Sequence, residues 1–213
     1  GAAPLPPETT MKKTALAALA ALSLATPVAA QSVLRVVPHA DLRTLDPVAV
    51  SVVITRMHGL MIYESLFAWD SKLQPQPQMV ESWSVTPDQL TWRFTLRDGL
   101  AFHDGTPVTT ADVIQSLRRW MARDVVGSRI GDALASMEAV DARSFTLVLK
   151  KPFGLMTYAL GSAVGQIPIV MTEAEAKTEA GRPVTTTLGS GPFRFVREQW
   201  MAGQRVVYER NPA

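Results

Sequence analysis

Polar and apolar residues alternate most strictly in two segments of the chain, Thr91–Arg97 and Ser144–Lys150. In the first segment, Trp92, Phe94 and Leu96 share one face and polar residues occupy the other. Because successive side chains of a strand point to opposite sides, this alternation predicts half-buried antiparallel strands. Burying each large apolar side chain contributes about 1.5 to 3 kcal/mol, and this fixes the register, since a slip of one residue would bury arginines.

Weaker patterns predict further strands and one long loop. Segments rich in β-branched and aromatic residues favour strands at 32–37, 192–196 and 204–210. Residues 69–83 contain two prolines in a polar setting, which is typical of a surface loop. We therefore expect many short antiparallel strands joined by turns.

Two Asp-Gly pairs predict tight turns, because glycine tolerates the positive φ that such turns require. The first, Asp98-Gly99, follows the alternating strand directly. We expect a short return strand at Leu100–His103 and then a second turn at Asp104–Pro107.

Helical spacing of apolar residues predicts a buried helix across 48–67, interrupted at Gly59. A second helix begins where Thr109 stands three residues before Asp112, a pattern that resembles a capping box with aspartate in the acidic position. Apolar residues then follow at a spacing of four, which places them on one face. A short third helix is predicted to open at Thr172.

The composition predicts a packed globular protein. Of the 213 residues, 47% are hydrophobic and 19% are charged, unlike the pattern of disordered chains, and the length allows one large domain or parts of two. The net charge is +2 and the basic residues are scattered, so we expect no nucleic-acid partner. The chain has no cysteine, which excludes disulfides, thiolate metal sites and cysteine nucleophiles from these residues.

Residues 11–30 have the three parts of a secretory signal peptide: a basic start, an apolar run and small residues that end at Ala30. The apolar run has about 12 residues, whereas a membrane-spanning helix needs about 20. We expect Sec export, cleavage after Ala30 and a periplasmic protein without a lipid anchor, since no cysteine follows the cut. Residues 1–10 differ in composition and are interpreted as an upstream extension that is not native.

The stretch 97–113 places His103 beside Asp104, which raises the question of a catalytic pair. On a continuous strand the two side chains point to opposite faces, and an aspartate before glycine typically bonds to backbone two residues on, so we interpret the stretch as scaffold. His39 and His58 lack the spacing of metal motifs. Neither G-x-S-x-G nor G-x-G-x-x-G occurs, so we expect no catalytic residue, no metal and no cofactor.

Residues 79–113 combine several motifs: Glu-Ser-Trp before an alternating strand, a Leu-Arg-Asp-Gly turn, Phe-His-Asp-Gly-Thr-Pro, and a helix opening through Ala-Asp-Val. Together they resemble the signature of the family 5 extracellular solute-binding proteins, the peptide, nickel and related binding proteins of ABC importers. The flanking segments YESLFAWD, LDP, GSGPFRF and YERNP are similar to that family too. The resemblance covers nearly all of residues 33–212.

The resemblance implies a mixed α/β fold (α+β) of the periplasmic binding protein-like class II type, with two lobes. Family members are more than twice as long, so we interpret the chain as an amino-terminal fragment that holds most of the first lobe and lacks the second. Residues 31–47 and 186–213 are expected to be parts of the first-lobe core domain. Residues 48–185 are expected to form a family-specific subdomain.

The function implied is non-enzymatic. The protein is expected to be a monomeric periplasmic component of an ABC importer that captures a small solute, for which we choose peptide, and delivers it to permease subunits in the inner membrane. Two alternatives stay open at this point: a solute-binding sensor for a signalling receptor, and a secreted hydrolase that uses His103.

In members of the family, the loop after the first strand and the start of the next helix face the ligand. The corresponding ligand-binding candidates here are His39, Asp41, Arg43, Thr44, Thr55, Arg56 and His58. Asp41 or Arg43 could meet a peptide terminus through a charge-assisted hydrogen bond. Alternatively, the two pair with each other or keep a loop solvated.

Overall fold

The computed structural model describes residues 33–212, and Pro38–Ala213 group as one compact unit. The predicted signal peptide at 11–30 and the extension at 1–10 lie outside the described residues. Over the part that is described, the predicted strand at 32–37 is wrong, because 33–37 are exposed and irregular. A strand needs a hydrogen-bonded neighbour, and none pairs with this segment within the described part of the chain.

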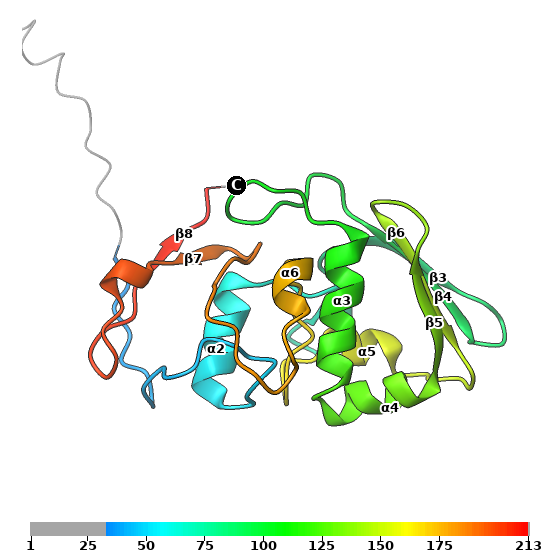
Figure 1. Ribbon diagram of the computed structural model, residues 1–213, viewed down its shortest axis with the longest axis horizontal. Helices are drawn as coiled ribbons and strands as arrows, with labels where there is room; N and C mark the ends of the chain where they lie inside the picture. Colours follow the sequence, from blue (N-terminus) through cyan, green and yellow to red (C-terminus); the bar gives the residue numbers. More distant parts are fainter. Residues whose placement is uncertain (1–32, 213) are drawn as a thin grey trace, which may run out of the picture. The chain divides into compact units, whose positions relative to one another are not determined.

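A four-stranded antiparallel sheet forms one side of the unit, in the order β3-β4-β6-β5 (Figure 1). Its strands are β3 (Val80–Val85), β4 (Thr91–Leu96), β5 (Leu134–Ala139) and β6 (Ser144–Leu149). The strands predicted from strict alternation, β4 and β6, are confirmed and occupy the two central positions. The rings of Phe94 and Phe145 face each other across that pair, with centroids 5.1 Å apart.

The helix α3 (Thr110–Met121) packs against this sheet, and α4 (Val125–Ala133) follows it at the lower end of the view (Figure 1). Val113 and Leu117 of α3 are fully buried in the same core as Phe94 and Phe145. The predicted capping box is confirmed. A threonine cap therefore starts the helix whose apolar stripe covers the sheet.

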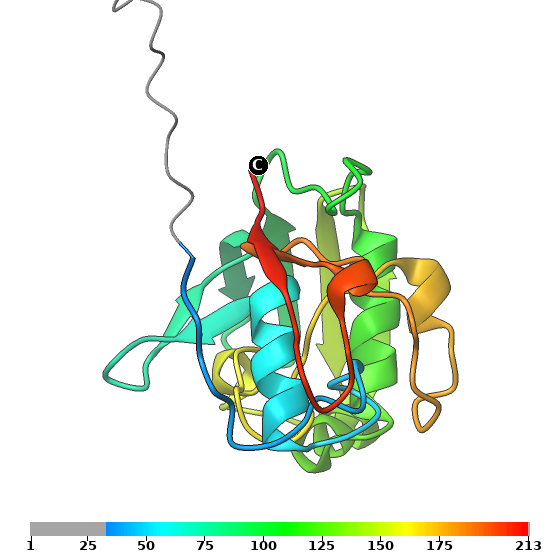
Figure 2. The same ribbon diagram turned by 90° about the vertical axis from the view of Figure 1, so that its left-hand side faces the viewer.

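The other elements form the opposite side of the unit. The helix α2 (Val53–Ile62) lies beside a two-stranded ribbon of β7 (Phe193–Phe195) and β8 (Tyr208–Arg210) (Figure 2). The remaining elements are β1 (Phe67–Trp69) paired with β2 (Pro75–Pro77), α5 (Met156–Leu160), α6 (Glu173–Ala176) and the 3-10 turn η1 (Arg197–Gln199).

Several predicted elements differ from the structure, among them the strand predicted at 204–210, which begins only at Tyr208. The helix predicted across 48–67 is shorter, and Gly59 does not interrupt it; an added Cβ there would lie 2.7 Å from Pro47 Cγ, so glycine allows close packing. The segment 69–83 is not a loop throughout, since it contains β2 and the start of β3. The return strand at Leu100–His103 is wrong, because β3 and β6 already pair with both sides of β4, and only one bridge from Ala101 forms.

Within the residues that the structure describes, no helix is both long and apolar enough to span a membrane.

Candidate functional site

The first three predicted ligand contacts lie in the loop that precedes α2. His39 is exposed, and the side chain of Arg43 is 86% exposed. Asp41 accepts a hydrogen bond of 2.8 Å from the backbone of Gly203 and lies 3.6 Å from Arg43. The alternative in which Asp41 and Arg43 pair with each other therefore describes the observed geometry.

Thr44, Thr55 and Arg56, the next three predicted residues, take part in hydrogen bonds that involve the backbone. The buried hydroxyl of Thr55 donates to the carbonyl of Thr44 at 2.8 Å. The guanidinium of Arg56 donates to the carbonyl of Ser51 at 3.3 Å. These bonds hold the segment that leads into α2, so the residues position the helix; their contact with a ligand stays a prediction.

His58 faces the interior, between α2 and the ribbon. Its Nδ1 lies 2.7 Å from the Tyr208 hydroxyl, and Phe195 meets the ring edge-on at 5.2 Å. Burial, helped by the positive charge of Arg197, lowers the pKa of His58 to about 4. The imidazole is therefore neutral near pH 7 and acts as a packing group, while its Nε2 has no partner among the described residues.

His103, in the stretch 97–113, has a structural role, as predicted. His103 Nε2 lies 2.9 Å from the carbonyl of Gly191, and its backbone nitrogen donates to Gly189. Asp104 accepts both bonds of its own turn from Thr106, so it is not directed at His103. No group of three or more potential metal ligands gathers within the described residues. The stretch ties the loop after β4 to the segment before β7.

A buried ion pair is the most strongly bonded polar feature, and the sequence did not reveal it. Arg119 of α3 donates to Asp46 at 2.7 and 3.2 Å, and both side chains are at most 1% exposed. Asp46 also accepts bonds from the backbone nitrogens of Val48, Ala49 and Val184. The pair joins the LDP turn to the core helix and to the loop after α6. Because every described contact of these charges lies inside the protein, we interpret the pair as structural.

The helix α2 has an inverted distribution of side chains. Its polar residues Thr55 and His58 are 1% and 2% exposed, whereas Val53, Met57 and Leu60 are 46%, 51% and 47% exposed. These three recur at spacings of four and three, so they form one stripe on the helix surface. An apolar stripe left open to solvent beside buried polar groups is typical of a binding surface.

Two other segments that carry exposed valines approach the turn that precedes this stripe. Arg123, at the end of α3, donates to the carbonyl of Ala49 at 3.0 Å, which brings the start of α4 beside the turn before α2. A Cβ on Gly165 would lie 2.6 Å from a carboxylate oxygen of Asp124, so the loop after α5 also reaches this point. We call this surface the valine face. It consists of Val52, Val53, Met57 and Leu60 before and on α2, Val125 and Val126 on α4, and Val164 in the loop.

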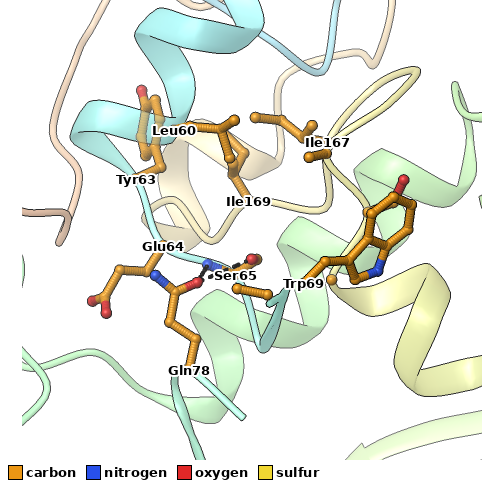
Figure 3. A pocket seen from close by; sticks show the side chains of 12 residues that line it. Leu60, Tyr63, Glu64, Ser65, Trp69, Gln78, Ile167 and Ile169 are labelled. Carbon is orange, nitrogen blue, oxygen red and sulfur yellow. Dashed lines mark hydrogen bonds between the residues drawn. The ribbon is translucent and has the colours of Figure 1, made fainter. Parts of the chain in front are cut away.

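A recess opens beside the valine face, between α2, β1 and the loop after α5 (Figure 3). It has a volume of about 210 Å³. Leu60, Ile167 and Ile169 form its apolar wall, and Trp69 stands opposite them (Figure 3). Leu60 belongs both to this wall and to the exposed stripe, so the recess and the valine face are continuous.

Comparison with known proteins gives a consistent result. The family profile described as bacterial extracellular solute-binding proteins, family 5 Middle, matches residues 74–213. A probable peptide ABC transporter periplasmic-binding protein, y4tO of Sinorhizobium fredii, is 40% identical over 205 residues. These residues are 93% of this chain but 38% of that relative, so the chain spans well under half of its length. A probable D,D-dipeptide-binding periplasmic protein of Escherichia coli K12, DdpA, is 33% identical over 139 residues, which are 63% of this chain and 26% of that relative.

Solved structures show the same fold. The binding protein AgaA of A. tumefaciens R10, in complex with agropinic acid, aligns with a TM-score of 0.67 and 29% identity over 79% of this chain and 34% of that chain. OppA of Haemophilus influenzae, in complex with the peptide RPPGFSPFR, aligns with a TM-score of 0.66 over 81% of this chain and 37% of that chain. Since OppA is only 21% identical, its likeness concerns the fold alone.

Proposed function

Since the chain belongs to the bacterial extracellular solute-binding proteins of family 5, we propose that it is part of the peptide-binding component of an ABC importer, with the valine face as its contribution to the binding site. The family binds solutes without converting them, in agreement with the expectation of a non-enzymatic protein. The expected mixed α/β fold, a partial periplasmic binding protein fold, is confirmed by structures of which this chain covers about a third.

The exposure of apolar side chains on α2, beside buried polar ones, is the observation on which the proposal rests. Leaving Val53, Met57 and Leu60 open to water while burying Thr55 and His58 costs free energy unless a partner covers the stripe. None of the described residues covers this stripe, so it is available to a solute that binds and dissociates. A solute-binding protein requires this behaviour.

The chemistry of the valine face favours a peptide as the solute. Valine and methionine side chains offer apolar contact to peptide side chains. Arg123, before the start of α4, donates to the carbonyl of Ala49 and has no carboxylate partner within the described residues. A peptide supplies both apolar side chains and a terminal carboxylate that a guanidinium can bind. The relatives named for peptides and dipeptides support the same choice.

We propose a periplasmic location and permease subunits of an ABC importer as partners. The relatives are named periplasmic binding proteins, which supports this location. Export through residues 11–30 and cleavage after Ala30 stay predictions, as does the division into a core domain at 31–47 and 186–213 with a subdomain at 48–185. A monomeric state likewise stays a prediction.

The variant Val125→Asp of the full-length protein tests the proposal. Its affinity for a panel of tripeptides is measured by calorimetric titration. Val125 is the first residue of α4 and is 71% exposed, so an aspartate there is compatible with the helix start and should not unfold the protein. The new carboxylate would stand beside Arg123 and repel the peptide carboxylate. We expect peptide affinity to fall by about tenfold or more, equivalent to about 1.4 kcal/mol.

Val140→Asp is the matched control, because Val140 is also exposed but lies after β5, outside the valine face. Its affinity for the same tripeptides should equal that of the unaltered protein. Equal losses in both variants, or no saturable binding of any tripeptide by the unaltered protein, would count against peptide capture on this face.

A further inference from the structure

Several polar groups on the walls of the recess beside the valine face are bonded within the protein. Gln78 Oε1 accepts from both the backbone nitrogen and the hydroxyl of Ser65 at 3.2 Å (Figure 3). Trp69 Nε1 donates to the carbonyl of Tyr158 at 3.0 Å, and Ser162 donates to Val164 at 3.1 Å. An apolar group that enters the recess would therefore leave these bonds in place, so the free-energy cost of removing these polar groups from water would be low.

Glu64 is the charged residue on the lining, and its carboxylate points out of the recess towards Arg97. Glu64 extends away from Trp69, on the far side of Gln78 (Figure 3). Its carboxylate lies 3.3 Å from the guanidinium of Arg97, outside the recess lining. Burial raises the pKa of Glu64 above its ordinary value, although a hydrogen bond with Ser190 and the charge of Arg97 oppose the shift. The recess thus offers a guest Leu60, Ile167, Ile169 and the indole of Trp69 rather than a free charge.

The volume decides the size of the guest. An apolar cavity of about 150 Å³ is known to bind benzene. The recess, at about 210 Å³, therefore admits a benzene-sized ring together with the methylene that would join it to a chain. The bond from Trp69 to Tyr158 fixes the plane of the indole, and a fixed aromatic wall favours a second ring in an edge or offset arrangement over an aliphatic group of equal size.

We propose that this recess binds the aromatic side chain of a peptide whose remaining atoms lie on the valine face. The peptide part of this inference rests on the proposed function, whereas the ring site itself rests on the recess. Leu60 connects the two surfaces, because it is 47% exposed on the stripe and also lines the recess. Ala163, exposed and on the lining, marks the opening.

The test titrates the full-length protein with N-acetyl-phenylalanine amide and N-acetyl-cyclohexylalanine amide, followed by ligand-observed NMR. The two probes match in size and differ in aromaticity. We expect saturable binding of both, with the phenylalanine probe preferred several-fold. Ala163→Trp should close the opening and weaken binding at least tenfold. Leu60→Ala removes part of the wall and should weaken probe binding several-fold. This second variant keeps the proposal testable if Ala163→Trp folds poorly. Ala202→Trp, at an exposed turn outside the recess, should bind as the unaltered protein does.

The outcomes separate the two proposals. Absence of saturable probe binding, or binding that Ala163→Trp and Leu60→Ala leave intact, overturns the ring site. A second titration with Ala-Phe-Ala and Ala-Ala-Ala addresses the peptide: preference for Ala-Phe-Ala of tenfold or more, lost in Ala163→Trp, supports the whole inference. If the amide probe binds in the recess but neither tripeptide binds, the recess is a site for an aromatic ring, and the proposal that the solute is a peptide is wrong.

Discussion

At the scale of single residues, the strongest constraint is the Asp46–Arg119 pair. Two charges that are almost wholly removed from water cost several kcal/mol each in desolvation, and only complete bonding offsets this cost. Arg119 Nε donates to the carbonyl of Thr178 and Nη2 makes a second bond to the carbonyl of Arg182, so all three guanidinium nitrogens are bonded. The loop after α6 is thereby held against α3.

Asp46→Ala should lower the free energy of unfolding by about 3 to 5 kcal/mol, because it leaves the Arg119 charge buried without a partner. Asp41→Ala breaks the pair with the exposed Arg43 and should cost about 1 kcal/mol or less. Urea denaturation of the two variants measures both values. Comparable losses would show that the buried pair is not the main tie of the LDP turn.

At the scale of secondary structure elements, Asp112 does more than cap α3. One of its carboxylate oxygens accepts bonds from the backbone nitrogen and the hydroxyl of Thr109, at 2.8 and 2.7 Å. The other oxygen accepts a hydrogen bond of 2.8 Å from the backbone nitrogen of Glu173, the first residue of α6. The same side chain thus sets the start of two helices that lie side by side in Figure 1.

Asp112→Ala should therefore destabilise the protein by about 2 kcal/mol, since bonds to a charged acceptor are lost and buried donors remain. Asp132→Ala, at an exposed position of α4 where the carboxylate has no hydrogen bond or ion pair with the described residues, should change stability by less than about 0.5 kcal/mol. Thermal and urea unfolding of both variants provide the comparison. A neutral effect of Asp112→Ala would mean that Thr109 alone suffices to start α3.

At the scale of the whole unit, the ribbon near the carboxyl end of the described chain is attached to α2 through aromatic contacts. His58 and Tyr208 are 150 residues apart in sequence, and the ring of Phe195 contacts both, with centroid distances of 5.2 and 5.9 Å. Trp200 extends this cluster at 5.9 Å from Phe195. The contacts are long-range, so ribbon docking depends on the tertiary structure.

The neutral state of His58 should make stability depend on pH. Its pKa is about 4 in the folded protein, below the ordinary value of 6.5, so the unfolded chain binds more protons between these values. The contribution of His58 is complete above about pH 6.5 and is lost as the pH falls towards 4. A pKa difference of one unit corresponds to about 1.36 kcal/mol, so the loss in the free energy of unfolding approaches about 3 kcal/mol.

Unfolding curves of the unaltered protein, His58→Phe and Tyr208→Phe at several pH values test this dependence. His58→Phe should flatten the change between about pH 4 and pH 6.5, because it removes the titrating group. Tyr208→Phe removes one hydrogen bond but keeps the imidazole buried, so it should keep the slope at lower stability. An unchanged slope in His58→Phe would assign the pH dependence to other groups.

Local patterns predicted a large part of the fold. The alternation in β4 and β6, the turn at Asp98-Gly99 and the cap at Thr109 depend on residues close together in sequence, and all three are confirmed. The strand β3 was missed because five of its six residues are exposed, so its edge position leaves no alternation of burial to detect. The Asp46–Arg119 pair was missed because nothing near either residue signals the other.

The sequence by itself determined the central strands, the tight turns and the start of α3, because each follows from side-chain spacing and backbone preference within a few residues. Only the tertiary structure decided which apolar residues of α2 are covered. From sequence, Val53, Met57 and Leu60 read as a buried stripe and His58 as a ligand contact, whereas packing against the ribbon turns the imidazole inward and leaves the valine face in water. Burial depends on which distant segment packs against a helix, and helical spacing carries no information about that partner.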